Sequence, residues 1–163
     1  MILRPATTAD TPRILAWNLA DVHFLAPLDQ ARLAYLTERA AAVEIIETTG
    51  RDQAGFVITF VEGSDYDSEN YRWFSDHEPA FHYVDRIVID PAARGTGLAR
   101  AVYAGLASRY PDRPLVAEVN TRPANDASLA FHATLGFTEI GRLEDSAKGV
   151  VLLRLAPKSV PAG

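Results

Sequence analysis

Two periods of hydrophobic positions alternate along the chain, and each predicts a different kind of element. Short runs rich in β-branched and aromatic residues predict about seven strands, over residues 2–4, 43–48, 55–61, 81–90, 115–119, 137–142 and 150–155. Apolar residues that recur every three or four positions predict about four helices, over residues 8–20, 29–40, 98–110 and 126–135. Candidate caps support these limits, with Asp29 and Asn125 before two helices and Gly136 after the last.

The order of these elements, β-α-α-β-β-β-α-β-α-β-β, predicts an α/β protein. Hairpins alternate with helical crossovers, so the central sheet must be mixed and mostly antiparallel. Residues 62–78 hold six acidic side chains and several aromatic ones between two strand patterns, and we expect a long loop there. A chain of 163 residues is expected to form a single domain over 1–163, with residues 157–163 as a frayed tail.

Composition removes several classes of protein. The chain is 48% hydrophobic and 23% charged, which is typical of a globular protein rather than a disordered or fibrous one. The longest charge-free apolar stretch, around residues 55–61, is far shorter than a membrane helix. The first residues lack the layout of a signal peptide, so the expected location is the cytoplasm.

Net charge and the content of metal-ligating residues argue against nucleic acid and metal ions as ligands. A net charge of −5 disfavours nucleic acid as a partner. Because the chain has no cysteine, it has neither a thiolate metal site nor a cysteine nucleophile. The spacing of His77 and His82 matches no ligand motif, so no metal is expected.

The most informative segment joins a strand to a helix through two glycines. The strand Ile87-Val88-Ile89 leads through Asp90-Pro91 to Arg94-Gly95-Thr96-Gly97-Leu98-Ala99, where a helix begins. Such a junction presents free backbone N–H groups at the positive end of a helix, and glycines let an anion approach them closely. The segment lacks the lysine of a Walker A loop, and Arg100 stands where a dinucleotide fingerprint has its third glycine. By itself the Gly-Thr-Gly pattern is equally consistent with a plain turn.

Three separated segments, in one order, resemble the GNAT superfamily of N-acetyltransferases. Residues 94–99 are similar to its (Gln/Arg)-x-x-Gly-x-(Gly/Ala) signature, and residues 125–137 (NDASLAFHATLGF) to its later Asn…Ser…Phe-Tyr…Leu-Gly-Phe segment. Residues 2–6 look like its first strand. The resemblance spans essentially the whole chain. It implies a sheet whose fourth and fifth strands splay apart, with acetyl-CoA as co-substrate in the gap.

The resemblance also implies contacts with that co-substrate. The backbone of residues 87–89 would pair with the pantetheine amides, and the turn from Arg94 to Ala99 would surround the pyrophosphate, with added charge from Arg94 and Arg100. Asn125 and Ser128 would reach the same molecule from the last helix. Plainer readings stay open: a buried strand for residues 87–89, a solvated helix face for Arg100 and a simple N-cap for Asn125.

His132 departs from the family pattern. The family usually has a tyrosine at this position, which protonates the departing thiolate. A histidine could serve as that acid, or could donate a hydrogen bond to the sulfur as a neutral ring. It could equally be a packing residue beneath Phe137.

Two carboxylates are candidates for the base that takes a proton from the attacking amine. Glu118 interrupts the apolar run 115–119 and matches a position where some family members place a base. Asp85 is its rival on the fourth strand. Strict alternation places Asp85 with Ile87 and Ile89 on one face, and Arg86 with Val88 on the other. Asp85 could instead form an ion pair with a neighbouring arginine, and Glu118 could be a solvent-facing strand residue.

The acceptor site is implied by the family to lie among the first two helices, their connection and the loop before the fourth strand. This implies roles for Trp17, Asn18, His23, Phe24 and Trp73, with Asn120 orienting substrate or a water. Carboxylates beside aromatic rings suit an ammonium ligand, although a solvated loop with a few packed rings explains them as well.

The expected function is transfer of an acetyl group from acetyl-CoA to a primary amine of a small molecule or peptide, by direct attack in a ternary complex. The alternative is a non-catalytic acyl-CoA-binding module or sensor, because His132 replaces the usual tyrosine. The mismatch with the dinucleotide motif argues against redox chemistry. The family resemblance adds a homodimer as a further expected partner, and a membrane is not expected.

Overall fold

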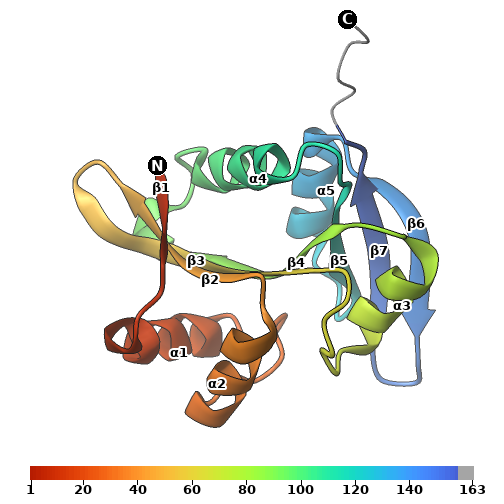
Figure 1. Cartoon of the computed structure of the whole chain (residues 1–163), viewed down its shortest axis with the longest axis horizontal. Helices are drawn as coiled ribbons and strands as arrows, with labels where there is room; N and C mark the ends of the chain where they lie inside the picture. Colours follow the sequence, from red (N-terminus) through yellow and green to blue (C-terminus); the bar gives the residue numbers. More distant parts are fainter. Residues whose placement is uncertain (158–163) are drawn as a thin grey trace, which may run out of the picture.

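A seven-stranded sheet organises the molecule (Figure 1). The computed structural model describes residues 1–157. The strands run in the order β1-β2-β3-β4-β5-β7-β6, and each neighbouring pair is antiparallel except β4 with β5. Their bounds are β1 (Ile2–Pro5), β2 (Ala42–Thr48), β3 (Arg51–Val61), β4 (His82–Ile89), β5 (Leu115–Arg122), β6 (Thr138–Glu144) and β7 (Gly149–Leu155). The mixed, mostly antiparallel sheet expected from the sequence is confirmed.

The helices begin and end close to the expected caps. Their bounds are α1 (Thr11–Ala20), α2 (Gln30–Arg39), α3 (Glu69–His77), α4 (Leu98–Arg109) and α5 (Asp126–Leu135). Asp29 caps α2 by accepting the N–H of Arg32, and Asn125 caps α5 by accepting the N–H of Ser128. Gly136 ends α5 at φ 92°, a left-handed conformation that glycine adopts without strain.

The acidic segment before β4 is not a loop throughout, and this corrects the sequence expectation. Residues 69–77 form α3, capped by Ser68, whose Oγ accepts the N–H of Tyr71 at 3.3 Å. Tyr71 and Phe74 are buried at helical spacing, while Glu69 and Asp76 are exposed. This helix is only nine residues long and mostly polar, and the acidic composition of the whole segment favoured a loop.

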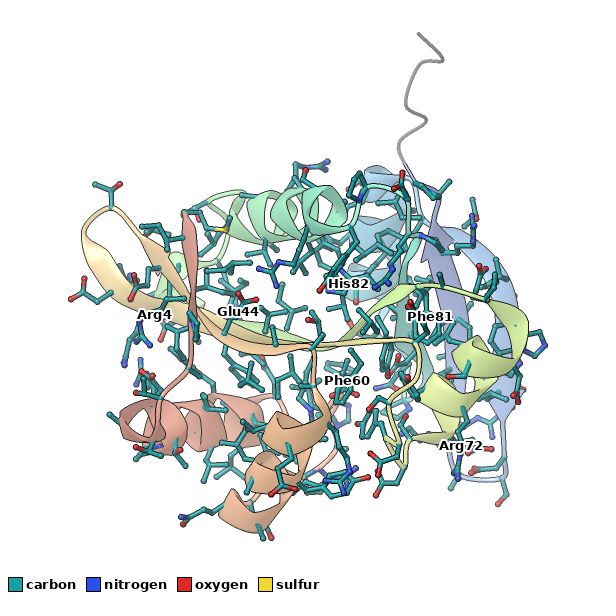
Figure 2. All side chains as sticks on the ribbon, in the orientation of Figure 1. Arg4, Glu44, Phe60, Arg72, Phe81 and His82 are labelled. Carbon is teal, nitrogen blue, oxygen red and sulfur yellow. The ribbon has the colours of Figure 1, made fainter. Side chains whose placement is uncertain are left out.

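Helices α1, α2 and α3 lie against one face of the sheet, and α4 and α5 cover the other (Figure 1). Figure 2 shows Phe60 on the first face, and Glu44 and His82 on the second. Phe60 stacks on the Tyr66 ring at 4.2 Å within the first hydrophobic cluster. Glu44 is buried and pairs with Arg109 of α4 at 2.9 Å. Each face therefore has its own core, and the sheet is held between them.

The two parallel strands β4 and β5 pair only near their beginnings. The register joins His82 to Leu115 and runs as far as Val84 with Ala117, after which the strands separate. Residues 85–89 and 118–122 therefore border a gap in the sheet, which is the splayed arrangement expected from the family resemblance.

A β-bulge changes which face of β4 each side chain occupies. Ile58 of β3 lies opposite Arg86, but the next residue, Thr59, lies opposite Val84, so Asp85 is an extra residue on β4. Asp85 and Arg86 consequently share the face covered by α1, where Arg86 donates to Asn18. The expectation that strict alternation would separate them is wrong, because an inserted residue shifts the period by one.

Among residues 1–157, no helix is long and apolar enough to cross a bilayer. The tail expected to fray spans residues 157–163, and all of it except Pro157 lies outside the described residues.

Candidate active site

A cavity of about 450 Å³ opens where β4 and β5 diverge. Its walls come from the α1–α2 connection, from the segment leading into α3, from the two diverging strands and from the β6–β7 turn. We call it the splay cavity. It contains five of the expected site residues, namely Phe24, Asp85, Glu118, Asn120 and Asn125. Parts of the chain that are far apart in sequence thus meet at one hollow.

Glu118 on β5 has the properties of a proton acceptor. Its Oε1 accepts a hydrogen bond from the Tyr83 hydroxyl at 2.9 Å. Its Oε2 is buried and has no hydrogen-bond partner within residues 1–157. Burial, and then the negative charge of Asp85, raise the pKa of Glu118 to about 7. A carboxyl with such a pKa and a free oxygen can take up a proton near neutral pH.

Asp85 is held differently. Its Oδ1 accepts the Tyr66 hydroxyl at 2.7 Å and lies 3.3 Å from the Tyr83 hydroxyl, while its Oδ2 pairs with Arg86 at 3.0 Å. The Arg86 guanidinium is itself buried and also donates to Asn18 at 2.8 Å. Both oxygens of Asp85 are therefore engaged. Asp85 is suited to hold charge beside Glu118 rather than to receive a proton from a substrate.

The acceptor residues expected from the sequence separate into two groups. Phe24 and Asn120 line the splay cavity, and the Asn120 side chain donates to the Phe24 carbonyl at 2.7 Å. Trp17 does not reach it: the ring is buried against Phe56, and its Nε1 donates to Asp90 at 2.9 Å. Trp73 stacks on His77 of the same helix and packs against Gly141 of β6. Trp17 packs α1, and Trp73 packs α3, against the sheet.

Sequence reasoning missed several residues of the splay cavity. They are Arg32, Tyr66, Ser68, Asn70, Tyr83 beneath the floor, and Lys148. The acidic and aromatic composition of residues 62–78 pointed to this segment as a whole. It could not single out these side chains, because their positions depend on α3 and on the β6–β7 turn.

The glycine-containing turn forms a second hollow, of about 320 Å³, at the start of α4. Gly95 and Gly97 have φ values of 75° and 78°, and a Cβ at either position would meet no atom within 4 Å. The turn leaves the first amides of α4 without partners inside the helix, at its positive end. This arrangement fits the pyrophosphate of a CoA ester in shape and charge.

The two arginines of this segment make other contacts. Arg94 donates through Nε to the Ile89 carbonyl at 2.9 Å, and its Nη2 pairs with Asp21 at 2.9 Å. Arg100 donates to Thr134 of α5 at 2.9 Å. An anion bound here would therefore meet the backbone of 95–99 more directly than these guanidinium groups.

The peptide groups of residues 87–89 point in alternate directions. The N–H of Asp90 donates to Ala54 of β3, and peptide groups two residues apart in a strand share a direction. Val88 therefore bonds to β3, whereas Ile87 and Ile89 turn their N–H and C=O groups toward the gap. The bond from Arg94 to the Ile89 carbonyl fits this assignment. Ile87 and Ile89 thus have backbone groups that could pair with a pantetheine arm, whereas the backbone of Val88 is used by β3 and its side chain is buried in the first core cluster.

His132 is buried between α4 and α5. Its Nδ1 lies 2.8 Å from the Ser128 carbonyl, so it carries the proton, and its Nε2 accepts the Tyr103 hydroxyl at 2.8 Å. Ser128 Oγ is 3.3 Å from the same Nδ1. Burial lowers the pKa of His132. A neutral ring with both nitrogens engaged is suited to packing.

Among residues 1–157, no group of three or more His, Asp or Glu side chains is placed to hold a metal ion.

Comparisons with known proteins identify the family. A family model described as "Acetyltransferase (GNAT) family" matches residues 13–137, whereas a search of curated proteins finds no match. Among solved structures, the Escherichia coli ribosomal-protein-S18-alanine N-acetyltransferase is 20% identical, with a TM-score of 0.69 over 99% of this chain and 96% of that one. Chaetomium thermophilum Naa20 in complex with a bisubstrate analogue is 16% identical, with a TM-score of 0.73 over 96% of this chain and 86% of that one.

A third similar structure carries the co-substrate. The protein yncA from Salmonella typhimurium, with its cofactor acetyl-CoA, is 21% identical, with a TM-score of 0.65 over 100% of this chain and 97% of that one. At such identities the three structures establish a shared fold. The family model covers most of the sequence, including the glycine turn and the segment through Phe137, and the chain therefore belongs to the acetyltransferase (GNAT) family.

Proposed function

We propose that this protein is an N-acetyltransferase that moves an acetyl group from acetyl-CoA to a primary amine of a small molecule or peptide, with both substrates bound together. Family membership and the fold support acyl transfer. The observation that carries the proposal is Glu118, a half-buried residue that lines the splay cavity at the edge of the gap between β4 and β5, with a raised pKa and an Oε2 atom that makes no hydrogen bond within residues 1–157. When bound, acetyl-CoA supplies the acetyl group as an activated thioester.

The chain's own residues would hold acetyl-CoA through its backbone. The gap-facing peptide groups of Ile87 and Ile89 match the amides of an extended pantetheine arm, as in a sheet edge that accepts another strand. The free amides after Gly95 and Gly97 match the pyrophosphate. These contacts would set the acetyl end beside the splay cavity, because both hollows border the same gap.

Glu118 would then take the proton that an ammonium group must lose before it can attack. Oε2 receives the proton, while the Tyr83 hydroxyl holds Oε1 in place. Asp85, fixed by Arg86 and Tyr66, keeps the pKa of Glu118 near the working pH.

The unprotonated amine would attack the thioester carbon, the C–S bond would break, and the leaving CoA thiolate would take its proton from water, so His132 receives no proton-transfer role in this proposal. Its bonds to Ser128 and Tyr103 brace α5 against α4. The same observation keeps a second candidate function, a non-catalytic acyl-CoA-binding module, because the proton donor usual in the family is replaced by this engaged ring.

Calorimetric titration with acetyl-CoA tests the site. Micromolar binding is expected for the wild type, and Gly97→Glu should abolish it by placing a carboxylate among the amides meant for an anion. Gly50→Glu is a matched control, since Gly50 has a similar φ of 81°, has open space around it and lies in the β2–β3 turn. Equal binding by the wild type and Gly97→Glu would overturn the assignment of the glycine turn.

A further inference from the structure

The polar groups of the splay cavity are distributed unevenly between its floor and its rim. Most of the charges that line it cancel in pairs, Asp85 with Arg86 at 3.0 Å and Arg32 with Asp67 at 2.6 Å. Glu118 on the floor remains as a carboxyl without an ion pair within residues 1–157. Lys148 remains on the rim as a cation without an ion pair in the same part of the chain. The two residues carry opposite charges on one cavity.

The rim is built from hydrogen-bond donors. Ser68 Oγ accepts the N–H of Tyr71 at 3.3 Å, which leaves its hydroxyl proton to donate. Asn125 Oδ1 accepts the N–H of Ser128 at 3.2 Å, which leaves its amide NH₂ group to donate. Lys148 has donors only. Each of these three side chains lines the splay cavity and presents N–H or O–H groups to it.

Lys148 stands on a braced turn. Asp145 Oδ1 accepts the N–H groups of Ala147 and Lys148, both at 2.7 Å, and the Asp145 carbonyl accepts a bond from Arg122 at 2.9 Å. Ser68 and Lys148 also border an outer hollow of about 200 Å³, so they mark the outer side of the splay cavity.

Three carboxylates border the outer hollow, and each has other contacts or a favourable position. Asp145 is engaged by the turn amides, and Glu144 lies 3.8 Å from Arg122. Glu69 occupies the first turn of α3, where the helix dipole favours a negative charge. The turn amides, and to a smaller extent the charge of Lys148, lower the pKa of Asp145, but Lys148 makes no ion pair within residues 1–157, so its ammonium group can also meet a ligand.

We propose that the acceptor is a small amine that also carries a carboxylate, of amino-acid size. Its ammonium end would lie against Glu118 on the floor, and its carboxylate would lie against Lys148, Ser68 and Asn125 on the rim. This inference rests on the proposed acetyl transfer and adds to it the class of acceptor. A volume of about 450 Å³ accommodates such a molecule together with the acetyl end of the donor.

Matched substrates test the proposal. A set of α-amino acids is compared with the corresponding α-amides, which keep the side chain and the amine but lose the negative charge. With acetyl-CoA present, at least one free acid should release thiol with a kcat/KM about tenfold above that of its amide. Amidation lowers the pKa of the α-amine, so near neutral pH more of the amide than of the free acid has an unprotonated amine that can attack. A preference for the free acid would therefore run against this difference in reactivity.

Lys148 variants test the inference through the KM for free acids compared with the KM for amides, which a merely structural role of Lys148 would not change selectively. Lys148→Glu should raise KM for the preferred free acid at least about tenfold, leave kcat within about threefold and leave KM for the amide unchanged. Lys148→Arg should restore most of the affinity. Equal use of acids and amides by the wild type, or a Lys148→Glu variant with unchanged preference, would overturn the inference while leaving acetyl transfer standing.

Calorimetric binding of the same acids and amides, without turnover, tests the acceptor class separately from acetyl transfer. Binding of a free acid that is lost in Lys148→Glu would support the acceptor class even if thiol release were absent. Thiol release with the amides alone would refute the acceptor class but support the transferase. Neither binding nor release with any free acid would overturn the inference.

Discussion

Asp85 and Glu118 share one tyrosine hydroxyl, and this arrangement leads to a quantitative prediction. Tyr83 lies 2.9 Å from Oε1 of Glu118 and 3.3 Å from Oδ1 of Asp85, so these two carboxylate oxygens lie at most about 6 Å apart. The substitution Asp85→Asn removes the negative charge and keeps an oxygen that can accept the Tyr66 hydroxyl. It should lower the pKa of Glu118.

The magnitude follows from Coulomb's law. Two unit charges about 6 Å apart at an effective dielectric constant of about 20 interact by roughly 3 kcal/mol, or about 2 pKa units. Burial is the larger cause of the raised pKa and remains in the variant. A fall of 1 to 2 units, from about 7 to roughly 5–6, is therefore expected.

The assay is the pH dependence of kcat/KM, whose acidic limb reports the base of the free enzyme. Asp85→Asn should move that limb to lower pH and leave the basic limb, set by the amine, unchanged. An acidic limb that stays in place or moves to higher pH would refute the coupling.

A double variant supplies the control for this experiment. Asp85→Asn alone leaves the Arg86 guanidinium buried without its carboxylate, which costs about 3–5 kcal/mol of stability. Asp85→Asn/Arg86→Met removes both charges. The lost cation should raise the pKa of Glu118 again, so the acidic limb should return toward its wild-type position in a more stable protein.

Three further predictions concern stability and the role of His132. Burial lowers the pKa of His82 from its usual 6.5 to about 4, so the unfolded chain takes up a proton at this residue at a higher pH than the folded protein. The free energy of unfolding should therefore fall by about 3 kcal/mol as the pH drops from 6.5 to 4. In urea unfolding His82→Phe should lose less stability over this range, and an equal loss would contradict the assignment. Gly141→Ala would place a methyl group against the Trp73 ring and should lower the free energy of unfolding in urea by about 1–3 kcal/mol. The control Gly105→Ala in α4 should be neutral or stabilising. Equal stabilities of the two variants would show that the Trp73 ring moves aside freely. His132→Phe should keep kcat within a few fold, and a loss of about 100-fold would restore the acid role.

Much of the fold is readable from local pattern, because its determinants are local. Asp29 and Asn125 cap helices with their own side chains, Gly136 supplies a left-handed residue, and the strands follow compact apolar runs. The turn with Gly95 and Gly97 is recognisable for the same reason. Its shape depends on the conformational freedom of two residues.

The rest depends on how distant segments meet. Helix α3 has only two buried residues, Tyr71 and Phe74, so its existence depends on the surface that it covers. The bulge at Asp85 is visible only in the pairing with β3, and it places Asp85 on the face of Arg86 rather than on the face of Ile87 and Ile89, where alternation would put it. Lys148 carries no local signal, because its place on the splay cavity is created by the turn between the edge strand β6 and its neighbour β7.

Amine-dependent release of CoA from acetyl-CoA, followed with a thiol-reactive dye at pH 7, tests the central claim most directly. The wild type should release thiol steadily with a suitable amine, and Glu118→Gln should lower kcat/KM by about 100-fold or more while binding acetyl-CoA as the wild type does. Glu139→Gln, on the surface of β6, should behave as the wild type. Wild-type rates in Glu118→Gln would contradict the role of this carboxyl. Tight acetyl-CoA binding without amine-dependent release would identify a binding module instead of an enzyme.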